Sequence, residues 1–164
     1  MFRPLARKGS LPGKEPEILR VGPVRKGEVI TVVALGETMA CGVLRAEDFD
    51  RAKRFYTEVV GLTLTHEATG PPREGIFSAG EGTMICIYGR PGLPAPQNTA
   101  LAFRVPVDGF EAFVETLRSR GVVFEEYDMP EIGLKTINGI TEMNDRKRSW
   151  FKDPEGNIIG LVSI

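Results

Sequence analysis

The chain has 164 residues, of which 41% are hydrophobic and 26% charged, and its formal net charge at pH 7 is −1. This length and composition are ordinary for one compact domain or for two small fused modules. A charge so close to zero gives no overall field that favours nucleic acid or an anionic membrane, and no apolar run is long enough for a transmembrane helix. The first residues lack the apolar core of a secretory signal. Because the two cysteines, Cys41 and Cys86, fit a reducing compartment, we expect a cytoplasmic protein.

Residues 1–37 are predicted to form an N-terminal arm that ends in one extra strand. Gly, Pro, Lys and Arg dominate up to about residue 27, without apolar periodicity. Residues 28–35, Glu-Val-Ile-Thr-Val-Val-Ala-Leu, are rich in β-branched side chains and stop before Gly36, which is typical of a strand. The arm is therefore treated as separate from the domain that follows it.

The rest of the chain, residues 38–164, contains one pattern twice, at 48–61 and again sixty residues later at 108–121. Each copy has apolar residues at helical spacing, begins with an Asp suited to the N-cap and ends at a Gly suited to a left-handed C-terminal position. In the second copy Glu111 follows Asp108 by three residues, which predicts a capping box. Two helices of matching length are expected.

Short strands are predicted before and after each helix. In the first half they are 38–45, 62–67, 75–79 and 83–88, and in the second half 100–105, 122–126, 135–140, 148–152 and 157–163. The order β-α-β-β-β therefore appears twice, in modules of about 38–96 and 97–164 that a linker rich in Gly and Pro joins. Two curved sheets with helices outside leave a concave inner face that suits a ligand, so we predict an α+β fold with a cavity.

Two stretches resemble a known family: 48–62, and 150–158 with the sequence Trp-Phe-Lys-Asp-Pro-Glu-Gly-Asn-Ile. They are similar to the first helix and the last tight turn of the glyoxalase, bleomycin-resistance and extradiol-dioxygenase group, the vicinal oxygen chelate superfamily. The resemblance covers about residues 38–164 and implies two βαβββ modules that form an open barrel around a cavity. Family members commonly pair, so we expect a homodimer, with the arm and strand 28–35 available for its interface.

The resemblance also implies where a metal would bind. In metal-using members the ligands are His, Glu or Gln on the strands that open each module, and Glu or His near their ends. The matching positions here carry Cys41, Cys86 and Gly160, and the strand 99–105 contains no His, Glu, Asp or Cys. Two thiolates do not replace a set of oxygen and imidazole ligands. We therefore expect no metal and no other cofactor, and no standard glyoxalase or dioxygenase chemistry.

The cysteines allow three interpretations, which the sequence leaves open. By strand alternation Cys41 shares a face with Val43 and Arg45, and Cys86 shares a face with Tyr88. The resemblance makes these strands neighbours, which would bring the cysteines close together on the cavity floor. They are interpreted as small apolar side chains that fill a core, as a reversible disulfide or reactive thiol, or as a two-thiolate site for a soft metal such as mercury or copper.

Small-molecule cavities are mainly apolar with a few convergent polar groups. The candidate ligand contacts on the inner face are Cys41, Arg45, Cys86, Tyr88, Phe103 or Arg104 according to register, Trp150 and Gly160. For Trp150 and Phe103 the alternative is core packing, and for Arg45 and Arg104 it is a solvated position at a sheet edge. The charged run 145–148 is interpreted as a solvated hairpin tip.

Three functional hypotheses follow. The leading one is a metal-independent protein that sequesters or senses a small, apolar or aromatic molecule. The second is an enzyme, a lyase or isomerase of glyoxalase type or a dioxygenase relative, with a non-standard site. The third is a thiol-based sensor that uses Cys41 and Cys86. Nucleic acid and membrane are not expected as partners.

Overall fold

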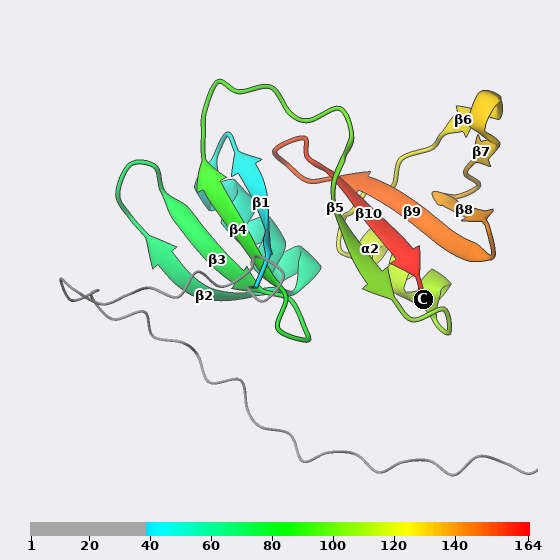
Figure 1. Ribbon diagram of the computed structural model, residues 1–164, viewed down its shortest axis with the longest axis horizontal. Helices are drawn as coiled ribbons and strands as arrows, with labels where there is room; N and C mark the ends of the chain where they lie inside the picture. The colour runs from blue at the N-terminus through cyan, green and yellow to red at the C-terminus, as the bar shows by residue number, and fades with distance from the viewer. Residues whose placement is uncertain (1–38) are drawn as a thin grey trace, which may run out of the picture. The chain divides into compact units, whose positions relative to one another are not determined.

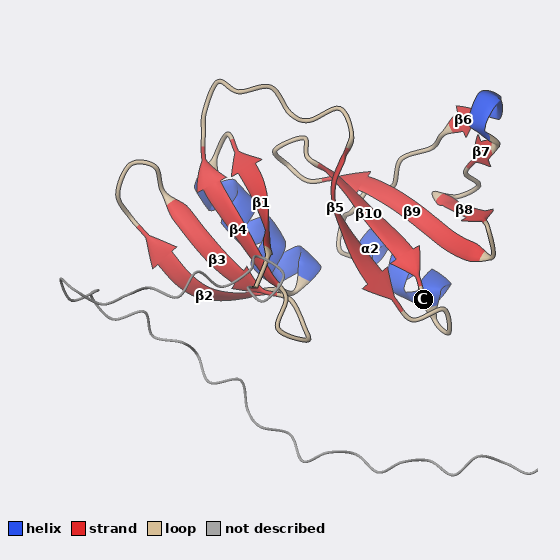
Figure 2. Ribbon diagram, viewed as in Figure 1, coloured by secondary structure: helices blue, strands red, loops and turns tan. Residues whose placement is uncertain are grey.

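The computed structural model describes residues 39–164 (Figure 1). The predicted arm and extra strand lie outside the described residues. The described part consists of two modules, each with one four-stranded sheet and one main helix packed against it (Figure 2). This confirms the predicted α+β fold and the repeated order β-α-β-β-β. None of the helices among these residues has the length and apolar character needed to cross a membrane.

The first module runs from Cys41 to Gly89. Its elements are β1 (Cys41–Ala46), α1 (Phe49–Arg54), the π-helical continuation η2 (Phe55–Val60), β2 (Thr63–Ala68), β3 (Glu74–Ser78) and β4 (Met84–Gly89). The strands lie in the order β1-β4-β3-β2, with β1 parallel to β4, and form what we call the first sheet. The helix begins and ends as predicted: the Asp48 carboxylate accepts from the Arg51 backbone N–H at 3.1 Å, and Gly61 has a left-handed φ of 88°.

The second module contains more elements than the first. They are β5 (Thr99–Val105), α2 (Phe110–Ser119), β6 (Asp128–Met129), the 3-10 helix η3 (Pro130–Ile132), β7 (Leu134–Lys135), β8 (Ile140–Met143), β9 (Arg146–Lys152) and β10 (Ile158–Ser163). The order β5-β10-β9-β8 defines the second sheet, with β5 parallel to β10, and β6 and β7 pair separately.

The predicted capping box at the start of α2 is wrong. Gly109 occupies the N-cap position with a left-handed φ of 93°, and no side chain caps this helix. Because the chain turns through the glycine, the helix starts one residue later than the box requires. The Glu111 carboxylate pairs instead with the ammonium group of Lys147 on β9. The predicted end of the helix is confirmed, since Gly121 has a φ of 92°.

Two predicted strands of the second module are also wrong. Residues 122–126 form only an isolated bridge, in which Phe124 lies opposite Phe151. Residues 135–140 are divided between the end of β7 and the start of β8, because the chain reverses at Asn138 and Gly139, which have φ values of 53° and 75°. Both segments contain β-branched or aromatic side chains, but a strand also needs a continuous partner edge.

Both modules contribute to a single hydrophobic core. Its largest fully buried side chains are Tyr56, Phe77, Phe110, Phe151, Leu44, Ile85, Ile87, Ile159 and Leu161. The edge strands β1 and β5 of the two sheets approach each other closely: a Cβ added at Gly42 would lie 3.1 Å from Leu101 Cδ1. The modules are thus packed against each other through buried apolar surface, and one face of each sheet is turned away from it. We call these the open faces.

Candidate functional site

The open face of the first sheet carries four of the eight candidate residues that the sequence singled out. Across β1, β4 and β3, Arg45 lies opposite Tyr88, and Tyr88 lies opposite Glu74. One row away, Cys86 pairs with Val43 on β1. Cross-strand partners share a face, so Arg45, Tyr88 and Cys86 lie on the same side of the sheet, as alternation along each strand predicts. Glu74 joins them, a residue that the sequence analysis missed because its strand partners were unknown.

The interpretation of both cysteines as core residues is wrong. The structure places Cys41 in an exposed position and Cys86 in a half-buried one, both as free thiols. Cys41 lies opposite Met84 in the register, so its Cα is offset from that of Cys86 by two residues and one strand, on the order of 8 Å. A disulfide normally joins closer Cα atoms. Burial raises the pKa of the Cys86 thiol to about 11, and the Glu74 carboxylate adds to the shift.

Arg45 is held at the junction between the modules. Its Nη2 donates to the backbone oxygen of Glu155 at 2.8 Å, and its Nη1 lies 3.6 Å from the Glu47 carboxylate. Its own backbone oxygen accepts from Asn157 Nδ2 at 2.9 Å. Only 12% of the Arg45 side chain is exposed. These contacts tie the end of β1 to the turn before β10, while the Nε and Nη1 atoms of Arg45 are buried without a hydrogen-bond partner among residues 39–164.

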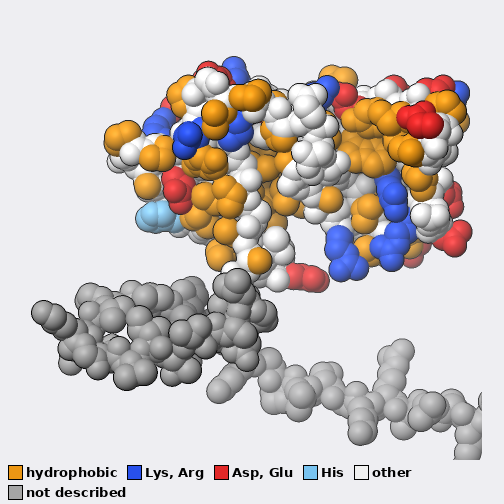
Figure 3. All heavy atoms as spheres, turned by 45° about the horizontal axis from the view of Figure 1, so that its top comes forward, with side chains coloured by type: hydrophobic (Ala, Val, Ile, Leu, Met, Phe, Trp, Pro, Cys, Tyr) orange, Lys and Arg blue, Asp and Glu red, His pale blue; other side chains and the backbone are white. Residues whose placement is uncertain are grey.

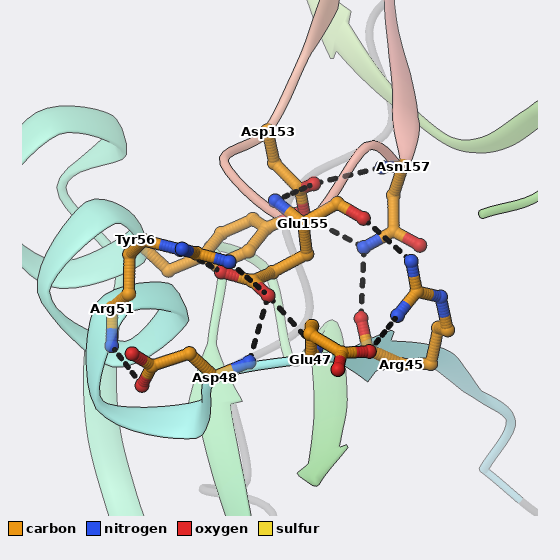
Figure 4. Close-up of polar contacts among 8 residues, drawn as sticks. All are labelled: Arg45, Glu47, Asp48, Arg51, Tyr56, Asp153, Glu155 and Asn157. Carbon is orange, nitrogen blue, oxygen red and sulfur yellow. Dashed lines mark hydrogen bonds and ion pairs between the residues drawn. The ribbon is translucent and has the colours of Figure 1, made fainter. Parts of the chain in front are cut away.

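Glu155 is the centre of this junction (Figure 4). Its side chain is fully buried, and its Oε2 accepts from the backbone N–H groups of Glu47 and Asp48 at 2.8 and 2.9 Å. Arg51 donates to both carboxylate oxygens, at 2.7 Å from Nε and 3.0 Å from Nη2. Burial alone would favour the neutral acid, but Arg51 and the two amides outweigh it and hold the pKa of Glu155 below its usual value. A charged carboxylate of the second module thereby anchors the start of α1.

Asp153 fixes the same turn from the other side (Figure 4). Its Oδ1 accepts from the backbone N–H groups of Glu155 and Asn157, and its Oδ2 accepts from the Tyr56 hydroxyl at 2.8 Å and from Asn157 Nδ2 at 2.7 Å. Burial raises the pKa of Asp153 despite these donors. Burial and the Asp153 charge raise the pKa of Tyr56 as well. The turn before β10, which resembles the last turn of the family, thus connects the two modules through buried hydrogen bonds.

The open face of the second sheet carries two more candidates, Trp150 and Gly160, which lie opposite each other on β9 and β10. In the next row Val162 lies opposite Arg104 on β5, so Arg104 is on this open face. Phe103 points the other way: it packs against the core and lines a second hollow of about 470 Å³ with Phe113 of α2. The strand register therefore places Arg104, and not Phe103, on the open face of the second sheet.

A pocket of about 560 Å³ lies beside Trp150, within the range that small-molecule sites usually occupy. The rings of Trp150 and Tyr127 meet edge to face, with centroids 5.6 Å apart. The remaining lining combines apolar and polar side chains, among them Met129, Leu134, Gln97, Asn98, Thr99, Glu125 and Lys152. Two half-buried aromatic rings with amide and charged groups around them can bind a planar molecule. The contact between Tyr127 and Trp150 was not predictable from the sequence, because Tyr127 lies in an irregular segment.

The residues present do not fit the metal site that the fold family implies. Among residues 39–164 there is no group of three or more His, Cys, Asp or Glu side chains arranged to hold a metal ion. The position on β10 where the family resemblance predicts a ligand is Gly160, whose added Cβ would lie 3.5 Å from Trp150 Cδ1 and 3.3 Å from Thr99 Cγ2. His66, the single histidine of the chain, is exposed on β2. A hard divalent cation needs several oxygen or imidazole ligands in one place, and these positions do not supply them.

The fold and the two open faces define a paired-βαβββ protein. The chain belongs to the Glyoxalase/Bleomycin resistance protein/Dioxygenase superfamily, whose family model matches residues 35–161. No curated protein matches the chain at a significant level.

Several solved structures have a similar fold. The glyoxalase family protein from Enterococcus faecalis is 19% identical, with a TM-score of 0.59 over 79% of this chain and 99% of that one. The integron cassette protein HFX_CASS4 from the Halifax Harbour sewage outfall is 15% identical, with a TM-score of 0.58 over 78% and 99%. The fosfomycin resistance protein FosX from Listeria monocytogenes, in complex with Mn(II) and sulfate, is 14% identical, with a TM-score of 0.57 over 78% and 93%. At these identities the likeness concerns the fold alone.

Proposed function

We propose that this protein is a metal-independent small-molecule-binding protein, which sequesters or senses an apolar or aromatic ligand. The ligand binds on the open face of the second sheet, in the pocket beside Trp150. The observation that carries the proposal is the pairing of Trp150 with Tyr127 at the edge of a 560 Å³ pocket. An aromatic pair of this kind offers a planar ligand both a ring face and a ring edge.

The residue at one of the family's metal-ligand positions supports the same proposal. Gly160 takes the place where the family's metal-using members carry an acidic ligand, and it leaves the ring of Trp150 close to the β10 backbone. A carboxylate at this position would bring a charge against the ring of Trp150. With glycine there, the β10 backbone beside the ring carries no charged side chain, which favours an aromatic molecule over a metal ion.

Isothermal titration calorimetry against a panel of small aromatic compounds tests the proposal. Purified full-length protein is first treated with EDTA, and its metal content is measured by mass spectrometry. We expect binding that EDTA does not weaken, and a loss of affinity of at least about tenfold in Trp150→Ala. Tyr88→Ala is the matched control, because Tyr88 is a half-buried aromatic residue on the open face of the other sheet.

Two results would refute the proposal. One is binding that requires a divalent metal. The other is binding that Tyr88→Ala abolishes while Trp150→Ala leaves it intact, which would place the ligand on the first sheet. An assay of hemithioacetal isomerisation on protein that has not been treated with EDTA, with and without added Zn(II) or Mn(II), addresses the enzymatic alternative, for which we expect no turnover.

We also propose that the protein acts in the cytoplasm as a homodimer. The free thiols of Cys41 and Cys86 support a reducing compartment. Sedimentation equilibrium measures the oligomeric state of the full chain. The same measurement on a variant that lacks residues 1–37 tests whether the arm contributes to dimer formation. A monomeric full-length chain at micromolar concentration would contradict the dimer.

A further inference from the structure

We propose that the ligand of the second sheet is an aromatic carboxylate, whose anionic group is bound by Arg148 and Arg104 next to Trp150. This inference rests on the proposed function and adds the charge of the ligand and the two residues that recognise it. Arg148 was not singled out from the sequence, where it belongs to a charged run at the start of β9.

The register places both arginines on one face. Strand β10 lies between β5 and β9, and Val162 near its C-terminal end is opposite Arg104 on one side and Arg148 on the other. Their Cα atoms are thus two strand spacings apart, roughly 10 Å. Both side chains are long enough to converge on one group that lies over Val162. Lys and Arg side chains also gather on the second module in the space-filling view (Figure 3).

Neither arginine has a counter-charge in the described part of the chain. No carboxylate of residues 39–164 forms an ion pair with Arg104 or Arg148, although Arg51, Arg73 and Arg118 are all paired. Arg148 is half-buried, and its Nε is fully buried without a hydrogen-bond partner among these residues. A buried guanidinium donor without an acceptor is costly, and an anion would satisfy it.

The acidic residues nearby leave the site open to an anion. Glu81 lines the same hollow as Arg104 but makes no ion pair with it. On the neighbouring strand β8, Thr141 is the residue opposite Arg148. Arg146, exposed on the same face of β9, adds a further positive charge. The electrostatic balance of this face therefore favours a negative ligand.

Trp150 lies where it can contact the aromatic ring of the proposed ligand. Trp150 and Arg148 are two residues apart on β9, so they share a face at a spacing of roughly 7 Å along the strand. A ring that lies on Trp150 and over Gly160 thus places a carboxylate attached to it within reach of Arg148. The planar guanidinium fork matches the two oxygens of a carboxylate.

Calorimetric titration with 2-naphthoate, 2-naphthamide and 2-naphthylmethylammonium at pH 7 tests the inference, because the three probes share a ring and differ in charge. We expect 2-naphthoate to bind at least about tenfold more tightly than 2-naphthamide, a difference of about 1.4 kcal/mol. In Arg148→Gln and in Arg104→Gln we expect this ratio to fall below about threefold. Arg54→Gln is the matched control, since it removes the same charge from an exposed residue on α1.

The outcomes separate the inference from the proposed function. If 2-naphthamide binds as tightly as 2-naphthoate, or if both arginine variants keep the ratio, the anionic site is wrong and the aromatic pocket stands. If none of the probes binds, the pocket itself is refuted and the inference with it. Should Arg148→Gln fail to fold, the exposed residue Arg104 still carries the test.

Discussion

Replacing Glu155 by glutamine tests the junction that holds the two modules together. The carboxylate is fully buried, and it accepts two backbone N–H groups and two N–H groups of Arg51. Glutamine keeps the shape of the side chain, but it replaces one acceptor oxygen by an NH2 group that faces donors. At least one of these donors is then left without an acceptor.

The expected loss of stability follows from these contacts. Removing one partner of a buried ion pair typically costs about 3–5 kcal/mol. Arg51 is 46% exposed, so water can take over part of its pairing when the charge is removed. The amide oxygen of glutamine also retains some of the hydrogen bonds. We therefore expect Glu155→Gln to lower the free energy of unfolding by about 2–3 kcal/mol at pH 7.

Urea unfolding at a series of pH values measures this loss. Because the folded pKa of Glu155 lies below its unfolded value of 4.5, its stabilisation is present above pH 4.5 and is lost as the pH falls through the folded pKa. The gap between wild type and Glu155→Gln should therefore narrow in acid. Glu115→Gln is the control: its pair with Arg118 is on the surface, and we expect a change within about 0.5 kcal/mol. A Glu155→Gln loss no larger than that of the control would refute the account of the junction.

Two further predictions concern buried groups. Tyr56→Phe removes the hydroxyl that donates to Asp153, so we expect a loss of about 1–3 kcal/mol in urea unfolding, and an unchanged stability would show that the turn does not need this bond. At pH 7.5 a thiol reagent should react faster with the exposed Cys41 than with Cys86, whose pKa is raised to about 11. Cys41→Ser should therefore remove the fast phase of the labelling reaction. If Cys86→Ser removes that fast phase instead, Cys86 is the more reactive thiol and the prediction is wrong. The pKa of Cys86 in the folded protein is also above the ordinary thiol value of 9.0, so the thiol ionises more easily in the unfolded chain. As the pH rises from 9 towards 11, the free energy of unfolding of the wild type should therefore fall relative to that of Cys86→Ser.

The repeated pattern made the fold predictable, because a cap, a helical apolar face and a left-handed glycine are all local signals. Asp48 and Gly61 bound the first helix as expected. At the second helix the same Asp signal failed, because Gly109 next to it adopts a left-handed conformation and takes the cap position. Sequence spacing does not reveal which of two adjacent residues will occupy the N-cap position of a helix.

The candidate site was only partly predictable for a similar reason. Alternation along a strand shows which residues share a face, and it placed Arg45, Tyr88 and Cys86 correctly relative to their strand neighbours. It does not show which of the two faces is buried, so the exposure of Cys41 was missed. Nor does it show contacts between distant segments, such as the meeting of Trp150 with a tyrosine from an irregular segment.

The run 145–148 shows how charge can mislead. Asn144 and Asp145 do form a tight turn, with φ values of 52° and 58°. Arg148, however, lies inside β9 and faces the same side as Trp150. A basic residue two positions before a tryptophan in a strand was the available signal, because a period of two puts both on one face.

The most direct test of metal-independent aromatic binding is a two-dimensional 15N–1H NMR titration of EDTA-treated protein with 2-naphthoate. Trp150 is the single tryptophan of the chain, so its indole N–H gives one side-chain resonance that reports on the pocket. We predict that this resonance shifts on titration, together with backbone resonances of β9 and β10, and that added Mn(II) or Zn(II) does not change the affinity. An unmoved indole resonance, or shifts confined to the first sheet, would contradict the account.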